Sequence, residues 1–185
     1  MATAKTGSFY LTATVKLDAG SASGTRVQGL IDTSSYVSVA NGQALAIDQV
    51  DFVHQVGADY GSDASSMVAG NGSIGAQLTD LNPGTAFVRA DNHSLIASSG
   101  LNIDQSNNVV THSTDMYPDN FANTSGSSGL NDMFLVVNDA MYLNAGVDNT
   151  SINISVYLTA RIRCRIVTLS PKNWTAIAIQ ATASQ

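Results

Sequence analysis

The chain contains no glutamate, a single cysteine and few charged residues of any kind. All 14 acidic residues are aspartates, and only eight lysines and arginines balance them. Glu, Lys and Leu sustain helices, whereas Thr, Val, Ile, Asn and Gly supply strands and turns, so this balance predicts an all-β fold and excludes a helical bundle. Because charged residues make up only 12% of the chain, Ser, Thr, Asn, Gln and Gly must form most of the polar surface.

The scarcity of basic residues also limits the kinds of partner that the chain is expected to bind. With a net charge of −6 and a pI near 4.6, the chain lacks the field of Lys and Arg that phosphate neutralisation needs, so we expect no direct nucleic-acid binding. The lone Cys164 lies in a run of alternating apolar residues and is predicted to be a core residue. No run approaches the ~18 apolar residues of a membrane helix, and the amino end lacks the apolar stretch of a signal peptide, so we expect a soluble chain.

A length of 185 residues fits one domain. We expect a single unit over residues 1–185, with its core in about 9–170, and a tail, 171–185, that forms a last strand or an arm docking on a neighbour. Residues 9–17 alternate cleanly and predict a half-buried strand. In 43–56 the apolar phase slips between Ile47 and Val50, which predicts a bulge or burial of both faces.

The middle of the chain is rich in Gly, Ser, Asn and Asp, with short apolar pieces at MVAG, TAFVRA, SLIAS and NVVTH. Short strands between long polar loops are typical of jelly rolls and other Greek-key sandwiches. Residues 117–132 give the strongest loop prediction. We therefore predict a single jelly-roll β-sandwich or barrel with long polar loops.

The last long strand predicted has the clearest pattern. Apolar residues from Ile154 to Cys164 share one face, while Arg161, Arg163 and Arg165 share the other. Side chains two apart on a strand stand roughly 6.6 Å from each other, so the guanidiniums form a ladder. This ladder is either a solvated face or an interface that meets carboxylates of the same or a neighbouring subunit. Together with Trp174 in the tail, the three arginines are the candidate interface residues.

No motif predicts catalysis. Gly70, Gly72 and Gly75 have the spacing of a dinucleotide fingerprint, but no helix can open before Pro83, so GNGSIG is interpreted as a glycine loop. Neighbouring Ser, His and Asp residues are interpreted as surface loops, because a triad needs convergence from separate elements; they are Asp91, His93 and Ser94, and His112, Ser113 and Asp115. The carboxylate pairs Asp48 with Asp51 and Asp115 with Asp119 lack sugar-binding aromatic segments around them.

No closely spaced His and Cys residues predict a transition-metal site. A structural Ca²⁺ in an Asp-rich loop remains open. We expect no enzyme, with no catalytic residues, no cofactor and no metal ligands that the sequence can name.

Several segments resemble a known family. LIDTSSYVSVANGQALAIDQVDFVHQVG resembles the entry to the jelly roll of the small major capsid proteins of tailless icosahedral, membrane-containing viruses of halophilic archaea. NDMFLVVNDAMYLNAGVDN and SINISVYLTARIRCRIVTLS resemble the closing strands of the same barrel. The resemblance covers residues 9–170 in overall rhythm. Halophilic members would carry more surface acid than this chain does.

The resemblance implies a structural protein of the virion, assembled in the host cytoplasm. It implies a single jelly roll, upright in the capsid, that associates with itself and with a second, larger capsid protein into pseudo-hexameric capsomers over an internal viral membrane. The alternative is a carbohydrate-binding or adhesin-type β-sandwich, although 6% aromatics with one Trp gives that little support. A β-sandwich hydrolase lacks an assembled acid–base pair.

Overall fold

The computed structural model describes residues 3–57, 63–115 and 133–182 of the chain, without the side chains of 112–115 and 180–182. Within these ranges it has ten strands, one short 3-10 turn and one α-helix, so the all-β prediction is confirmed. In chain order the elements are β1 (Thr3–Ala4), β2 (Phe9–Leu17), β3 (Arg26–Asp32), β4 (Gln43–Val56), η1 (Ala64–Met67), β5 (Gly72–Thr79), β6 (Leu95–Asp104), β7 (Val109–Asp115), β8 (Phe134–Val136), β9 (Ala140–Asp148), β10 (Val156–Thr168) and α1 (Pro171–Thr182). No helix among the described residues is long and apolar enough to span a bilayer.

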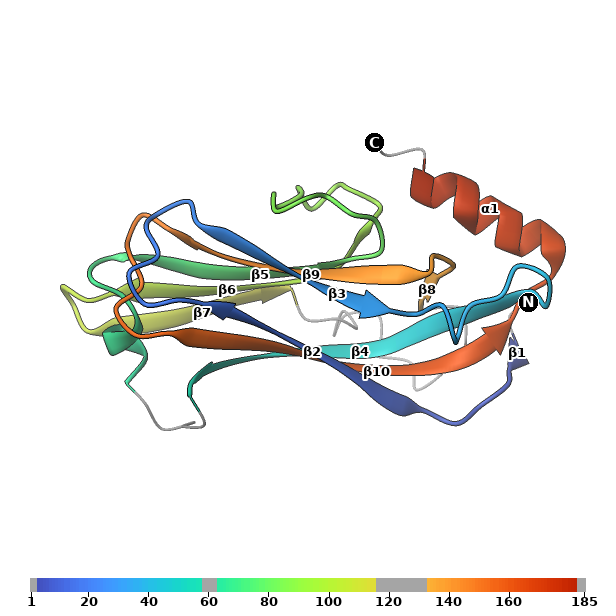
Figure 1. Ribbon diagram of the computed structural model, residues 1–185, viewed down its shortest axis with the longest axis horizontal. Coiled ribbons are helices and arrows are strands. Elements are labelled where there is room, and N and C mark those ends of the chain that lie inside the picture. The colour runs from blue at the N-terminus through green and yellow to red at the C-terminus, as the bar shows by residue number, and fades with distance from the viewer. Residues whose placement is uncertain (1–2, 58–62, 116–132, 183–185) are drawn as a thin grey trace.

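The strands form two antiparallel sheets that pack face to face as a β-sandwich (Figure 1). One sheet has the order β2–β10–β4–β8, with β1 also pairing with β10, and the other has the order β3–β9–β5–β6–β7. The pairing is nested along the chain: β2 pairs with β10, β3 with β9, β4 with β8, and β5 with β6. This nested order is that of a jelly roll, with β7 added at the edge of β6. The predicted fold class is confirmed.

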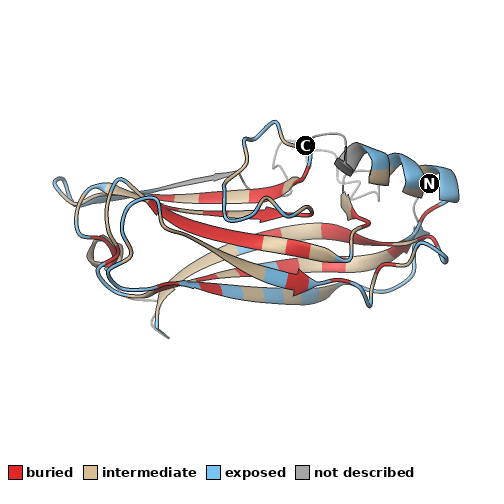
Figure 2. Cartoon of the chain, turned by 45° about the horizontal axis from the view of Figure 1, so that its top comes forward, coloured by how far each residue is buried: buried red, intermediate tan, exposed pale blue. Residues whose placement is uncertain are grey.

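Alternate residues of each strand fill the space between the sheets, and Figure 2 shows buried positions gathered along the strands. The predicted alternation of β2 is confirmed, because Val15 and Leu17 are buried between exposed neighbours. On β10 the buried face is also confirmed, and it includes Cys164, whose pKa burial raises to about 12. Ile154 is an exception: it precedes the strand and is exposed, because the chain is still turning out of β9 there.

The phase slip in β4 corresponds to both predicted features. Arg163 pairs with Gln49 while Cys164 pairs with Ile47, so Asp48 is the extra residue of a β-bulge. Before the bulge both faces are buried: Leu45 and Ile47 belong to the main core, and alanines on the opposite face belong to a second, smaller core. The bulge therefore shifts the core-facing phase of β4 from Leu45 and Ile47 before it to Val50 after it.

The tail was predicted to be a strand or a docking arm, and the strand prediction is wrong. Residues 171–182 form α1, which lies at the end of the sandwich beside the end of β10 (Figure 1). Pro171 is a favourable first residue because its missing N–H is unpaired there anyway, and Ser170 Oγ accepts the amide of Asn173 at 3.4 Å. Trp174 and Ile177 pack against the smaller core. The arm thus docks on its own sheet.

Two further sequence interpretations are wrong. Residues 70–75, interpreted as a glycine loop, run into β5 from Gly72 onwards, and Ile74, Ala76 and Leu78 of this strand are buried. Gly72 sits there because a Cβ would clash with Asp148 O at 2.6 Å. The piece TAFVRA is not a strand and lies in the long connection between β5 and β6. The loop predicted over 117–132 falls outside the described residues.

Gly42 is a position where the fold requires glycine. Its φ is +61°, and a Cβ would lie 2.5 Å from the carbonyl oxygen of Leu169. We expect Gly42→Ala to destabilise the protein by about 2–4 kcal/mol, measured by urea unfolding, because the energy of a positive φ at alanine adds to that of the clash between Cβ and the Leu169 carbonyl. Gly20→Ala is the control: its φ is +85° but it has open space around it, so it should cost only about 1–2 kcal/mol. Equal losses would show that the contact with Leu169 is unimportant.

Candidate interaction face

The predicted arginines lie on the outer face of the β2–β10–β4 sheet. They alternate with buried Ile162 and Cys164, which point into the core. In the register of the sheet, Arg161 lies between Thr12 of β2 and Asp51 of β4. We define the basic face as Tyr10, Lys16, Tyr157, Arg161 and Arg163 on this surface, which also carries the exposed Asp51.

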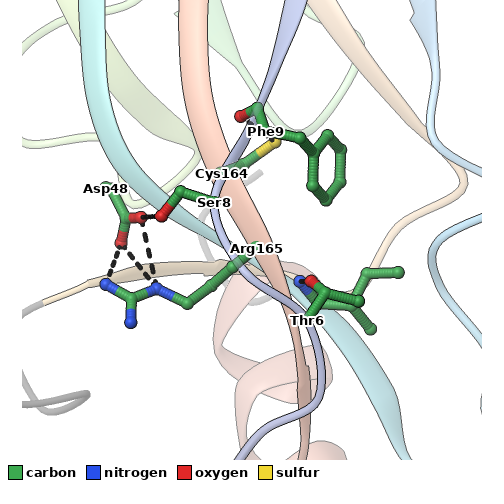
Figure 3. Close-up of polar contacts among 7 residues, drawn as sticks. Thr6, Ser8, Phe9, Asp48, Cys164 and Arg165 are labelled. Carbon is green, nitrogen blue, oxygen red and sulfur yellow. Dashed lines mark hydrogen bonds and ion pairs between the residues drawn. The ribbon is translucent and has the colours of Figure 1, made fainter.

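Arg165 belongs to a different arrangement from the other two arginines (Figure 3). Its Nη2 donates to Asp48 Oδ1 at 2.8 Å, and its Nε lies 3.1 and 3.2 Å from the two carboxylate oxygens. Ser8 Oγ donates to Asp48 Oδ2 at 3.0 Å. The Asp48 side chain is only 5% exposed, and that of Arg165 is 25% exposed. The bulge in β4 thus supplies a carboxylate that neutralises Arg165 within the chain.

Arg161 and Arg163 have no such partner. Arg161 is exposed, with its guanidinium carbon 5.5 Å from the centroid of the Tyr10 ring, and Arg163 is half-buried. Although Asp51 lies opposite Arg161, its carboxylate accepts from Gln49 Nε2 at 2.9 Å. Among the described residues neither arginine forms an ion pair. Their guanidiniums can therefore bind anionic groups of another molecule.

The rest of the basic face is polar and aromatic. Lys16 Nζ lies 5.8 Å from the centroid of the Tyr157 ring and 2.6 Å from Asp18 Oδ1. Between these groups and the arginines, the hydroxyls of Thr14 and Thr159 are 2.9 Å apart. Basic groups therefore run along the face in a chain whose net charge is negative.

Trp174, the fourth predicted interface residue, is separate from Arg161 and Arg163. It packs with Ala44, Ala46 and Val167 in the smaller core, where α1 covers one end of the outer face. Its contacts in the structure stabilise the helix on the sheet. Its predicted role in an interface stays a prediction.

The outer face of the second sheet is covered by the connection between β5 and β6. Gln77 binds the backbone of Val88 in both directions, each bond measuring 2.8 Å. Asn144 Nδ2 donates to the carbonyls of Gly84 and Ala86 at 3.1 and 3.0 Å. Side-chain amides on β5 and β9 therefore hold this segment down. The sequence analysis did not identify them, and the one signal in the sequence is an Asn within the apolar run of β9, which the structure shows to be fully buried.

Arg26 holds the same segment from the sheet edge. Its Nη2 donates to both oxygens of Asp148 at 2.7 Å, and its guanidinium carbon lies 4.5 Å from the centroid of the Phe87 ring. Phe87 in turn covers Gly75 of β5, where a Cβ would approach its ring to 3.0 Å. Arg26 is thus a structural cation, unlike the exposed Arg161.

A buried carboxyl lies where this segment begins. Asp80 is 2% exposed; Asn138 Nδ2 donates to its carbonyl at 3.0 Å and lies 3.4 Å from Oδ2. Its Oδ1 has no hydrogen-bond partner among the described residues. Burial raises the pKa of Asp80 to about 7, against a smaller lowering by a backbone hydrogen bond. The sequence analysis did not identify this group.

The candidate Ser and Asp side chains that the structure describes have separate local partners, while the side chains of 112–115 and residue 119 lie outside the description. Ser94 Oγ donates to the carboxamide of Asn92 at 2.8 Å in a local turn, rather than to His93. Asp48 and Asp51 are engaged separately, with Arg165 and Gln49. Within residues 3–57, 63–115 and 133–182, no group of three His, Cys or Asp residues has a metal-binding arrangement.

The fold places the chain in the class of antiparallel jelly-roll β-sandwiches. No family model matches the chain, and no curated protein matches its sequence.

Proposed function

We propose that the chain is a shell-forming capsid protein, whose work is to associate with copies of itself and with a second, larger capsid protein. The jelly-roll strand order carries the proposal, because viral capsid domains are among the main users of that fold. In this proposal the capsomers are pseudo-hexameric, the sandwich stands upright over an internal membrane, and the protein resides in the virion after assembly in the host cytoplasm.

The basic face supports this proposal. Arg161 and Arg163 are held on a rigid central strand, and Tyr10 adds an exposed apolar ring beside them. Interfaces commonly combine such an aromatic anchor with arginines that pair with carboxylates. A loop-borne cation would lose more conformational entropy on binding.

The decisive experiment measures molar mass by light scattering across concentration and salt, for the chain alone and, if a larger capsid protein is encoded beside it, after co-expression with that protein. Discrete oligomers or shell-like particles support the proposal. A strict monomer under all conditions overturns it in favour of a carbohydrate-binding sandwich, for which a glycan array is the direct assay.

Removing the two arginines should weaken assembly without unfolding the chain. We expect Arg161→Ser with Arg163→Ser to raise the concentration at half-assembly about tenfold, because two charged contacts are lost from an exposed face. Arg165 is left intact, since it stabilises the bulge. Arg89→Ser is the matched control, because Arg89 is exposed on the connection over the other sheet. Assembly unchanged in the double variant removes the basic face from the interface.

A further inference from the structure

A second exposed patch complements the basic face. Leu30 of β3 is 64% exposed, and Asp32, two residues along the same strand, is exposed beside it. The amide of Thr33 donates to the carbonyl of Asp139 at 2.9 Å, which brings the exposed Asp139 next to Asp32. We define the acidic edge as Leu30, Asp32 and Asp139.

In the described part of the chain, no cation pairs with either carboxylate of the acidic edge. Asp32 Oδ1 accepts the amide of Ser34 at 2.9 Å, and hydrogen bonds from Ser34 lower the pKa of this carboxyl, so it is ionised at neutral pH. Neither Asp32 nor Asp139 forms an ion pair among the described residues. β3 is also an edge strand of its sheet, so no neighbouring strand covers this side.

The basic face and the acidic edge are complementary in charge, and each carries an exposed apolar group. The basic face presents the exposed Tyr10 ring and two guanidiniums without an ion pair among the described residues, on side chains whose strand positions are roughly 6.6 Å apart. The acidic edge presents two unpaired carboxylates and an exposed Leu side chain. Arg binds carboxylates bidentately, and apolar contact between Tyr10 and Leu30 would anchor the pairs.

The patches cannot meet within one chain. Arg161 and Arg163 lie on the outer face of the β2–β10–β4 sheet, whereas Leu30 and Asp32 lie on the other sheet, on the side away from the core. The outer faces of two packed sheets point in opposite directions. Their complementarity can therefore be satisfied only between molecules.

We propose that the basic face of one copy binds the acidic edge of the next copy. This inference rests on the self-association in the proposed function and names the surfaces that carry it. Such a contact is head-to-tail, with different surfaces on its two sides, so it produces a ring where the rotation closes and an extended array where it does not. Both outcomes suit a shell built from repeated copies.

The test is a charge exchange between two variants of the full chain. One carries Arg161→Glu and Arg163→Glu, so in contacts between its own copies two acidic surfaces face each other. The other carries Asp32→Arg and Asp139→Arg, so in contacts between its own copies two basic surfaces face each other. Each alone should associate at least about tenfold more weakly than the wild-type chain, as measured by sedimentation velocity. Their equimolar mixture should recover association, because each face then meets an opposite charge in the other variant.

Two additional variants keep the test interpretable. Asp32→Asn with Asp139→Asn retains an acceptor for Ser34 and should weaken association even if the Arg variant unfolds. Asp91→Arg is the control, because it changes the net charge by the same kind of step at an exposed residue outside both patches. Circular dichroism monitors folding throughout.

The outcomes separate this inference from the proposed function. A wild-type chain that never self-associates overturns both. A wild-type chain that associates, with charge variants that associate equally well or a mixture that recovers nothing, overturns only the pairing of these two surfaces. Recovery in the mixture supports the head-to-tail contact between copies.

Discussion

Replacing Asp80 by Asn is expected to stabilise the protein above pH 7 and to remove most of a pH dependence that the wild-type chain shows. The carboxyl of Asp80 is buried, and its pKa in the folded chain is about 7, against 3.8 as the ordinary value. Between these two pH values the folded chain keeps the proton that the unfolded chain releases. Folding therefore becomes less favourable as pH rises through this window.

The magnitude follows from the width of the window. Stability falls by about 1.4 kcal/mol for each pH unit in which the folded state binds one more proton, so Asp80 costs the wild-type chain up to about 4 kcal/mol by pH 8. Well below pH 3.8 both states are protonated and the cost vanishes. The carboxamide of Asn has nearly the same shape and no charge, so Asp80→Asn avoids the cost.

Urea unfolding at several pH values between 4 and 8 measures this effect. The free energy of unfolding of the Asp80→Asn variant minus that of the wild-type chain should rise between pH 4 and about pH 7 and then level off. Asp91→Asn, at an exposed carboxyl, is the matched control and should give a difference that changes little with pH. Parallel profiles for Asp80→Asn and the wild-type chain would show that Asp80 is ionised in the folded state and solvated.

Sequence analysis predicted correctly the strands whose apolar pattern depends only on packing one face against the opposite sheet. β2 and β10 alternate because one face meets the core and the other meets solvent, and the period-two pattern records that directly. The bulge in β4 was also predicted, because an extra residue shifts the apolar phase between Ile47 and Val50.

The errors arise where tertiary contacts overrule local pattern. β5 has glycines because Asp148 and Phe87 approach its backbone closely, and those contacts come from distant parts of the chain. For the tail a last strand was one of the two predictions, but Pro171 and Ser170 start a helix whose Trp174 and Ile177 pack on the smaller core. Helix and strand propensities alone could not predict that the smaller core offers a surface for this helix.

The arginine ladder was predicted as one unit, and the structure divides it. Strand spacing places the three guanidiniums on one face, but it says nothing of which carboxylate each one meets. Asp48 lies 117 residues earlier in the chain, and it reaches Arg165 because the antiparallel register of β4 and β10 brings them together at the bulge. The roles of Asp80 and Asn144 could not be predicted for the same reason, because their hydrogen-bond partners come from distant loops and strands.

The division of the ladder leads to the second large effect, at Asp48. We expect Asp48→Ala to destabilise the protein by about 3 kcal/mol, because it leaves a partly buried guanidinium without its carboxylate and empties a site that is only 5% exposed. The change also removes the acceptor of Ser8 Oγ, which joins the segment before β2 to the bulge. Urea unfolding at pH 7 measures the loss.

A double-mutant cycle with Arg165→Met separates the ion pair from other contributions. Arg165→Met alone should also cost stability, because it leaves the buried Asp48 carboxylate unpaired, whereas the double variant should recover part of the loss since no buried charge remains. Asp18→Ala is the control for an exposed pair, with Lys16, and should change stability by less than about 1 kcal/mol. Strictly additive losses in the cycle would mean that Asp48 and Arg165 do not interact. A coupling energy above about 1 kcal/mol would establish Arg165 as a residue of the fold and leave Arg161 and Arg163 as the arginines available to a partner.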